Sequence, residues 1–358
     1  MIYRKTYAEI NTANIIENIK RFKKSHQEYK YFIGVVKANC YGHGLCNETI
    51  KAMIAGGVNY FGVATLEEAL EVRQIDKKVP ILVLSKIELD AVKVACANKI
   101  TLTIPNLAYT KQLLRLKNLK GLKVHLKIDT GMNRIGAKTS AEADEIVRLI
   151  NNSNIILEGI FTHIFDVADK ERTYKQYAKF EQITKNIDLK KIKMVHCGAG
   201  DATLLYKKRP YANGCRFGDI MYGIQEIPDN KYLDTYKLIS KVIQVNKVKK
   251  GQTVGYGGLF SSKKDELIAL VPIGFADGLR RDSRGMFVYI NNKKYTIVGN
   301  VCMDMMFVKV DKNVKENDIV YIYKDRQHFY DWANFFKTAP DWMICNISKR
   351  VPRIYVKK

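Results

Sequence analysis

Short apolar runs alternate with longer helix-compatible segments from residue 31 to about residue 220. The apolar runs include YFIGVVK, YFGVA, VPILVLS, KITLTI and LKVHLKID, and the segments between them include TLEEALEVRQI, NLAYTKQLLRL, AEADEIVRLI and a predicted helix from Tyr174 to Ile187. Strand–helix repetition of this length favours a parallel sheet, and about eight such units that close on themselves form a (β/α)8 barrel. The sequence therefore predicts a TIM barrel over residues 11–232.

The pattern changes after about residue 233, where apolar and polar residues alternate with a period of two. The runs TYKLISKVIQVNKV, ELIALVPIGF, MFVYINNKKYTIVG and DIVYIY are separated by Gly, Asn and Asp turns. Such runs indicate a mostly antiparallel β domain over residues 233–358. A chain of 358 residues is long enough for both domains.

Composition narrows the possible partners. Lys and Arg number 60 against 36 Asp and Glu, which gives a net charge of +24, but the lysines are spread along the whole chain. We therefore expect a basic solvated surface and no nucleic-acid partner, since no nucleic-acid-reading module is recognisable. Without a long apolar run or a secretory signal we expect a cytoplasmic protein with no membrane partner. The seven cysteines lack CxxC spacing, so we expect reduced thiols and no metal site.

Two lysine-containing peptides end predicted strands, where α/β barrels gather their active sites. Lys37 closes VVK, and a lysine there either extends to the rim or captures a carbonyl group. The peptide LKIDTGMNRIG (126–136) presents Lys127, Asp129 and Arg134 before a glycine turn. An arginine fork at this place suits a carboxylate or a phenolate oxygen.

Several further stretches are candidates for the same site. HCGAGDAT (196–203) and RFGDIMYG (216–223) are either ordinary glycine loops or a phosphate site after the last barrel strands. Tyr256, between glycines in VGYGGLF, either projects into a site or lies on a surface turn. His43 and His163 are both interpretable as packed structural histidines, although only His163 stands at a strand end.

Together these motifs resemble the alanine racemase family, the pyridoxal phosphate (PLP)-dependent, two-domain proteins of fold type III. The resemblance runs nearly end to end, through YAEINTANIIENI, VVKANCYGHG, LKIDTGMNRIG, RFGDIMYG, VGYGGLF, IGFADG, VCMD and ISKRVPRI. It implies PLP as cofactor, an amino acid as small-molecule substrate, and a homodimer with shared active sites. It also implies that the strand within residues 1–10 joins the C-terminal β domain.

The resemblance assigns two bases to the reaction. Lys37 matches the lysine that carries PLP and then acts as one base, and Tyr256 matches the tyrosine that supplies the other from the partner subunit. Two bases are needed because inversion at Cα removes a proton from one face and delivers one to the other.

The remaining site residues are also implied by the resemblance. Arg216 matches the arginine that faces the pyridine nitrogen, and Arg134 the one near the PLP phenolic oxygen and the substrate carboxylate. Lys127 matches a lysine, often carbamylated, that supports this arginine, and His163 a histidine that hydrogen-bonds the catalytic tyrosine. The other positions that the resemblance assigns to the cofactor are Tyr41, His196, Gly200, Gly218, Asp219 and Lys349. Met303 is assigned to the substrate carboxylate, and Asp304 as support.

Three positions depart from the family pattern. Gly200 replaces a serine, Lys349 a tyrosine, and Phe275 the tyrosine of GYADG. Lys349 can meet the phosphate as a cation, but the pocket wall changes in shape and charge. We therefore expect an isomerase that interconverts L- and D-alanine, with a racemase of serine, basic or acidic amino acids as the alternative.

Two other functions fit the sequence less well. A PLP-dependent decarboxylase generally has an acidic residue at the pyridine nitrogen, where this chain has Arg216. A non-catalytic PLP-binding protein usually lacks the β domain and its tyrosine. The family role implied is D-alanine biosynthesis for peptidoglycan precursors, and a catabolic role stays open.

Overall fold

The structure is a computed structural model that describes residues 3–225 and 232–358. Contacts divide the chain into two compact units. The barrel unit comprises Ile16–Cys40 and Leu45–Met221, and the β unit comprises Met1–Ile15, Tyr41–Gly44 and Tyr222–Lys358.

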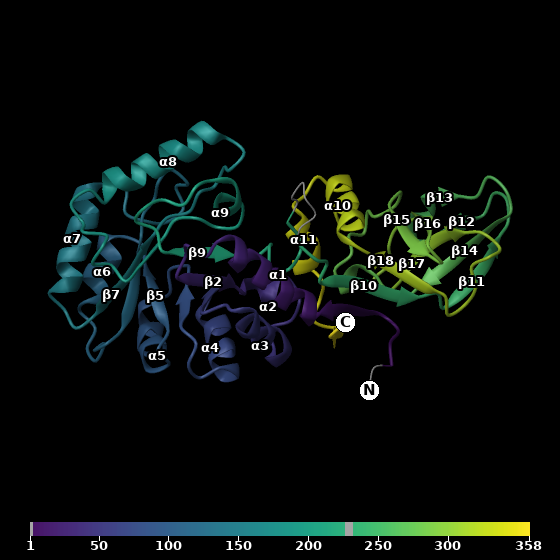
Figure 1. Ribbon diagram of the computed structural model, residues 1–358. Coiled ribbons are helices and arrows are strands. Elements are labelled where there is room, and N and C mark those ends of the chain that lie inside the picture. Colours follow the sequence, from purple (N-terminus) through teal and green to yellow (C-terminus); the bar gives the residue numbers. More distant parts are fainter. Residues whose placement is uncertain (1–2, 226–231) are drawn as a thin grey trace. The chain divides into compact units, whose positions relative to one another are not determined.

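The barrel unit contains eight strands, and all neighbouring pairs are parallel (Figure 1). They pair in the order β8-β7-β6-β5-β4-β3-β2-β9. The sheet closes where an isolated parallel bridge joins Ala199, after β8, to Arg216 in β9. The predicted TIM barrel is thus confirmed. The strands are β2 (Tyr31–Val35), β3 (Tyr60–Val63), β4 (Ile81–Val83), β5 (Thr101–Ile104), β6 (Lys123–Lys127), β7 (Ile156–Phe161), β8 (Met194–His196) and β9 (Gly214–Phe217).

Helices connect these strands, and several begin at a capping side chain. Thr65 caps α4 by accepting a hydrogen bond from the Glu68 amide, and Thr139 caps α7 in the same way. Asp169 caps α8, which therefore begins before the predicted helix start at Tyr174. The helices are α1 (Thr12–Ser25), α2 (Lys37–Tyr41), α3 (Asn47–Gly56), α4 (Leu66–Ile75), η1 (Leu89–Ala91), α5 (Val92–Ala97), α6 (Leu107–Leu113), α7 (Ser140–Asn151), α8 (Lys170–Ile183) and α9 (Asp201–Leu205).

The β unit is built on a sheet of nine strands among the described residues, in the order β11-β14-β17-β16-β15-β18-β10-β1-β19. All pairs are antiparallel except β1 with β19, so the predicted antiparallel β domain is confirmed. Strand β1 comes from the N-terminal segment and lies between β10 and β19. The strands of this sheet are β1 (Tyr7–Asn11), β10 (Tyr236–Lys241), β11 (Gln244–Val248), β14 (Glu266–Val271), β15 (Phe287–Ile290), β16 (Lys293–Val298), β17 (Met306–Val310), β18 (Ile319–Tyr323) and β19 (Arg353–Val356).

Smaller elements complete the β unit. A two-stranded ribbon flanks a short 3₁₀ turn, and two helices follow β18. These elements are β12 (Thr253–Val254), η2 (Tyr256–Gly258), β13 (Phe260–Ser261), η3 (Phe275–Asp277), α10 (Arg326–Phe335) and α11 (Pro340–Cys345). Within residues 3–225 and 232–358, no helix is long and apolar enough to cross a membrane. The same residues contain no group of three or more His, Cys, Asp or Glu side chains suited to a metal ion.

Candidate active site

Lys37 follows the end of β2 and begins a turn of unusual backbone geometry. Ala38, Asn39, Cys40 and Tyr41 have φ values of 52°, 55°, 54° and 49°, so the chain makes a left-handed turn. Each L-residue in this conformation costs about 1–2 kcal/mol, which makes a run of four expensive to maintain. The side chain of Lys37 is exposed at the carboxyl end of the barrel strands.

Two polar side chains of the barrel unit stabilise this turn. Glu68 accepts a hydrogen bond from the Ala38 amide at 2.6 Å, and Asn39 accepts one from the Leu45 amide at 2.7 Å. The second carboxylate oxygen of Glu68 also accepts from the Ala64 amide at 2.8 Å. The strained backbone after Lys37 is therefore fastened to the beginning of α4.

Arg216 on β9 is buried and donates to several acceptors at once. Its Nη1 donates to the Nδ1 atom and the carbonyl oxygen of His196 at 2.7 and 2.8 Å. Its Nη2 donates to the carbonyl oxygens of Thr162 and Cys197 at 2.7 and 3.3 Å and lies 3.4 Å from Nδ1 of His163. Burial lowers the pKa of Arg216 to about 10, which keeps it cationic at neutral pH.

His163 and Lys127 lie beside this guanidinium. Burial, and then the charges of Arg216, Lys127, Arg134 and Lys37, lower the pKa of His163 to about 2. Burial, followed by the charges of Arg216 and Arg134, lowers the pKa of Lys127 to about 7. Lys127 Nζ donates to the Ile128 carbonyl oxygen at 3.3 Å. These groups therefore share one strongly cationic environment, which an anionic ligand would stabilise.

The loop after Lys127 is shaped by Asp129. One carboxylate oxygen of Asp129 accepts from the amides of Gly131 and Asn133 at 2.9 and 3.1 Å, forming an Asx-type turn. The other oxygen is buried and has no hydrogen-bond partner among the described residues. Gly136 has φ +131°, and a Cβ there would lie 2.5 Å from the Asp129 amide nitrogen. This compact loop carries the exposed side chain of Arg134.

The two glycine-rich stretches begin at the ends of the last two barrel strands, HCGAGDAT at His196 in β8 and RFGDIMYG at Arg216 in β9. Gly200 has φ +41°, and a Cβ there would meet nothing within 4 Å, so the side-chain position of the family serine is open. Thr203 Oγ1 in the same stretch is buried without a hydrogen-bond partner among the described residues. Gly218 and Asp219 directly follow β9.

These features meet the requirements of PLP. An open glycine position and an orphaned hydroxyl suit its phosphate, a cationic cluster suits its oxygens, and an exposed lysine suits its aldehyde.

The residues predicted in the β unit lie on neighbouring loops of that unit. Tyr256 is 68% exposed and Met303 is 55% exposed. Gly274 lies close to the loop at Met303, because a Cβ on Gly274 would approach the Met303 carbonyl oxygen to 2.3 Å. The Phe275 amide donates to the Cys302 carbonyl oxygen at 3.0 Å. The loops that carry Phe275 and Met303 are thus held against each other.

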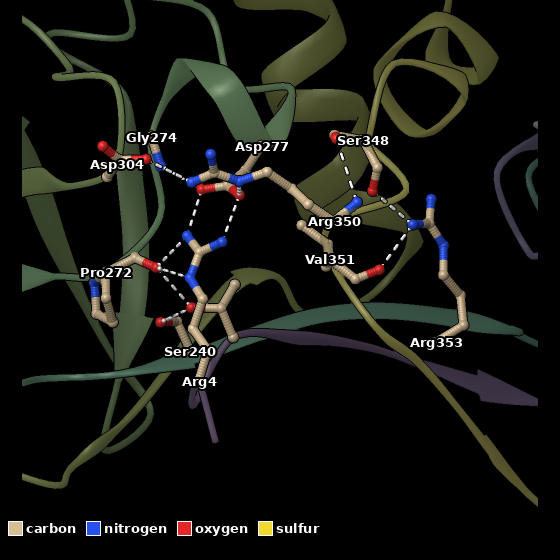
Figure 2. A network of polar contacts seen from close by, with 11 residues as sticks. Arg4, Ser240, Pro272, Gly274, Asp277, Asp304, Ser348, Arg350, Val351 and Arg353 are labelled. Atoms are coloured by element: carbon tan, nitrogen blue, oxygen red, sulfur yellow. Dashed lines mark hydrogen bonds and ion pairs between the residues drawn. The ribbon is translucent and has the colours of Figure 1, made fainter. Parts of the chain in front are cut away.

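A buried carboxylate fastens these loops to two arginines (Figure 2). Both oxygens of Asp277 accept from Arg4, and Oδ1 also accepts from Arg350 Nε at 2.7 Å. Arg350 in turn donates to Asp304 Oδ1 at 2.5 Å. Burial raises the pKa of Asp277, but Arg4, the Gly274 amide and Arg350 outweigh burial and lower it. Lys349, next to Arg350, is exposed.

Tyr41 and His43 belong to the β unit through their contacts. Tyr41 is buried and its ring lies 4.9 Å from that of Tyr222. His43 is fully buried, with its ring nitrogens 2.8 Å from Thr235 Oγ1 and 3.0 Å from the Tyr41 carbonyl oxygen. The interpretation of His43 as a packed structural histidine therefore fits these contacts.

The structure adds functional candidates that sequence reasoning missed. The sequence patterns do not single out Glu68, Asp277 or Arg350. Asp277 nevertheless lies in the motif GFADG, and Arg350 lies in ISKRVPRI. His125 and Glu158 were also missed. A histidine two residues before Lys127 on the same strand and a glutamate within the apolar run IILEGIF were available signals.

The chain combines a parallel barrel, whose strand ends are cationic, with an antiparallel sheet. This combination defines a class of two-domain proteins, and the cationic strand ends suit an anionic cofactor with a carbonyl group. Comparison with known proteins identifies the class more closely. The family model for the N-terminal domain of alanine racemase matches residues 10–226, and that for the C-terminal domain matches residues 235–355. The chain belongs to the alanine racemase family, whose members are PLP-dependent racemases.

Individual relatives agree with this assignment. Alanine racemase 1 of Bacillus subtilis is 34% identical, with 99% of this chain and 94% of that protein covered. The crystal structure of alanine racemase from Bacillus anthracis with bound L-Ala-P is 28% identical, with a TM-score of 0.93 over 100% of this chain and 96% of that chain. A histidine racemase from Leuconostoc mesenteroides shares the fold at 24% identity, with a TM-score of 0.88 over 100% of this chain and 99% of that chain.

Proposed function

We propose that the protein interconverts L- and D-alanine with PLP as its cofactor. When bound, PLP supplies an electron sink that acidifies the α-hydrogen of the amino acid. The arrangement of Arg216 carries the proposal. Its guanidinium is held by carbonyl oxygens and ring nitrogens that only accept, so it stays a cationic donor toward the pyridine nitrogen it would face. An acidic residue, as decarboxylases generally use, is absent from that place in β9.

Proton transfer is assigned to Lys37 and to Tyr256 of the partner subunit. Lys37 Nζ would hold the cofactor and exchange a proton with one face of Cα. Tyr256 is exposed on its own subunit, which suits a residue that completes a neighbouring site. His163 Nδ1 faces the Arg216 guanidinium, so its neutral ring carries the proton on Nε2 and can donate to the tyrosine oxygen.

Anion binding is assigned to two groups of residues. Arg134, supported by Lys127, and the amide of Met303 would bind the substrate carboxylate. Carbamylation of Lys127 requires its neutral amine, and a pKa lowered to about 7 supplies that form at physiological pH. The phosphate contacts proposed are Tyr41, Gly200, Lys349 and the backbone amides of Gly218 and Asp219, with Asp304 as support for the β-unit loops. His196, whose ring nitrogens both meet other side chains, serves the cofactor through Arg216.

The larger organisation is also proposed from the resemblance. Residues 11–232 serve as the PLP-binding domain, and residues 233–358 with strand 1–10 serve as the β domain. Two subunits form a homodimer with shared active sites, in the cytoplasm, and supply D-alanine for peptidoglycan precursors.

The test is a substrate profile of the purified holoenzyme. Each of the proteinogenic L-amino acids is incubated with the protein and the D-enantiomer is quantified. The proposal expects D-alanine to form with the highest kcat/KM. If no D-amino acid forms although PLP is bound, the protein is not a racemase.

Two side chains of the β unit favour a second candidate function, the racemisation of amino acids other than alanine. Lys349 is exposed where the family has a tyrosine, and Phe275, 39% exposed, replaces another. A cation at this wall favours a substrate with a polar or acidic side chain. The variant Lys349→Tyr tests the idea. If Lys349 widens specificity, the variant loses activity on larger substrates and keeps activity on alanine; an unchanged profile assigns the specificity elsewhere.

A further inference from the structure

The centre of the barrel unit contains ionisable side chains where such barrels usually carry branched apolar residues. His125 on β6, Glu158 on β7, His196 on β8 and Arg216 on β9 are all buried. The proposed reaction gives a role to Arg216 and leaves His125 and Glu158 without one. Burying such groups is costly unless each meets a partner, so their arrangement calls for an explanation.

These four side chains form a continuous line. Arg216 Nη1 lies 2.7 Å from His196 Nδ1, and His196 Nε2 lies 2.9 Å from His125 Nδ1. His125 Nε2 then lies 3.5 Å from Glu158 Oε2, close enough for electrostatic attraction although no hydrogen bond joins the two atoms. The line therefore connects the guanidinium to a carboxylate that it does not touch.

The chemistry of the groups sets a direction along this line. A guanidinium only donates, so His196 Nδ1 accepts. Burial and the charge of Arg216 hold the pKa of His196 well below its usual value, so the ring is neutral and carries its proton on Nε2. His196 therefore donates to His125 Nδ1. His125, whose pKa is also lowered by burial, carries its own proton on Nε2, facing Glu158.

The backbone of β7 is adapted to hold Glu158 in this place. The pairing of β6 with β7 shifts register so that Val124 pairs with Leu157 and His125 with Gly159, which leaves Glu158 as the extra residue of a bulge. Bulges re-aim side chains and occur beside active sites. Gly159 provides the space for the imidazole, because a Cβ there would lie 2.6 Å from His125 Nδ1.

Glu158 is kept ionised by its neighbours. The Tyr60 hydroxyl lies 2.8 Å from Oε2, and the ammonium groups of Lys193 and Lys123 lie 2.7 and 2.9 Å from Oε1. Burial alone raises the pKa of Glu158, but contacts from His125, Lys193, Lys123 and Tyr60 outweigh burial and hold it well below its usual range. A negative charge therefore stands at the far end of the line.

We propose that Glu158 and His125 are positioning residues that act on Arg216 through His196, forming a directed relay that keeps the guanidinium oriented and limits how far it gives up its protons. The Glu158 charge, 3.5 Å away, polarises the His125 N–H. Each polarised N–H makes the other nitrogen of its ring a better acceptor, so the carboxylate strengthens the hold of His196 on Arg216. This inference rests on the proposed function, because it concerns the donor that would face the pyridine nitrogen. A guanidinium held in this way shares less of its proton with that nitrogen.

The relay predicts a change in reaction specificity when it is broken. Stronger proton sharing at the pyridine nitrogen favours abortive transamination, in which alanine and PLP become pyruvate and pyridoxamine phosphate. The alanine is oxidised and the cofactor aldehyde is reduced: the amino group moves to the cofactor, and the carbonyl oxygen, exchanged through water, ends in pyruvate. The relay would suppress this side reaction relative to racemisation.

A first test uses the PLP-free protein. Nitrogen-15 NMR of its histidine side chains reports which ring nitrogen carries the proton. The relay requires neutral rings with the proton on Nε2 at both His125 and His196 at neutral pH. A proton on Nδ1 of either ring, or an imidazolium at either position, overturns the direction of the relay. This readout does not depend on catalysis.

A second test uses the holoenzyme and Glu158→Gln, which keeps an acceptor and removes the charge. We expect pyridoxamine phosphate formed per racemisation turnover to rise by at least about threefold. The matched control is Glu142→Gln, whose carboxylate accepts from the amides of Leu107 and Lys138 outside the relay and should leave the ratio unchanged. If Glu158→Gln does not fold, His125→Phe interrupts the same line and should give the same rise.

The outcomes separate the inference from the function. A wild-type protein that racemises while both relay variants keep its product ratio overturns the relay alone. A wild-type protein that binds PLP and racemises no amino acid overturns the proposed function, and the tautomer measurement still decides the relay.

Discussion

Glu68 accepts a hydrogen bond from the Ala38 amide at 2.6 Å, which ties the first residue after Lys37 to the N-terminus of α4. The same carboxylate accepts from Ala64 and completes the capping box of the helix. One side chain thus stabilises a helix start and the left-handed turn that presents the candidate catalytic lysine.

Replacing Glu68 with Ala should weaken both structures. We expect the free energy of unfolding to fall by about 2–3 kcal/mol, because a cap is lost and the Ala38 amide loses its acceptor. Lys37 should also bind PLP less tightly. Chemical denaturation and PLP titration measure the two effects. Glu67→Ala, an exposed position in the same first turn, is the control; equal losses in both variants would contradict this role of Glu68.

Replacing Asp277 with Asn should loosen the loops of the β unit. The fully buried carboxylate is shared by Arg4 and Arg350, so its loss leaves both guanidinium groups poorly paired. We expect destabilisation by about 2–4 kcal/mol and a raised KM for the amino acid. Asp282→Asn, in the exposed pair with Arg280, should change stability by less than about 1 kcal/mol. A KM equal to the wild-type value would show that Asp277 has no role in substrate binding.

The pH dependence of stability should report the buried Lys127. Its pKa is about 7 in the folded chain against 10.5 for an ordinary lysine, so the unfolded chain binds more protons between these values. The free energy of unfolding in carbonate-free buffer should therefore rise with pH across this window, by up to about 1.4 kcal/mol per pH unit for one proton. The Lys127→Met variant should lack this rise in the free energy of unfolding with pH. Lys138→Met, at an exposed position, should retain the rise. An equal slope in all three proteins would show that Lys127 does not titrate in this range.

The sequence predicts the barrel, the antiparallel sheet and the peptides that carry the candidate site residues, because all three depend on local patterns. Strand–helix alternation predicts a parallel barrel, and Lys37, Lys127 and Arg216 stand at or near strand ends whose position such a barrel fixes. The contacts that hold them were not readable. Glu68 meets Ala38 across thirty residues of sequence, and Arg4 meets Asp277 across far more, so no local pattern reveals either pair.

The polar relay escaped prediction for a different physical reason. His125 and Glu158 lie within apolar runs, where a single polar residue is ordinarily interpreted as a strand residue facing solvent. A register shift in β7 turns Glu158 toward His125, and such a bulge has no reliable sequence signal apart from the following Gly159. The left-handed turn after Lys37 was equally hidden, because Ala38 and Cys40 rarely adopt positive φ.

The central claim is that Lys37 and Tyr256 are the two bases and come from different subunits. The variants Lys37→Ala and Tyr256→Phe, each inactive alone in converting L- to D-alanine, are mixed in equal amounts, unfolded, refolded together with PLP and assayed. Half of the resulting dimers are mixed and each holds one intact shared site, so activity should return to about one quarter of the wild-type value. If the two bases belong to one subunit, no site in the mixture is intact. Activity that stays at the level of the separate variants, in dimers shown to be mixed, would contradict the claim.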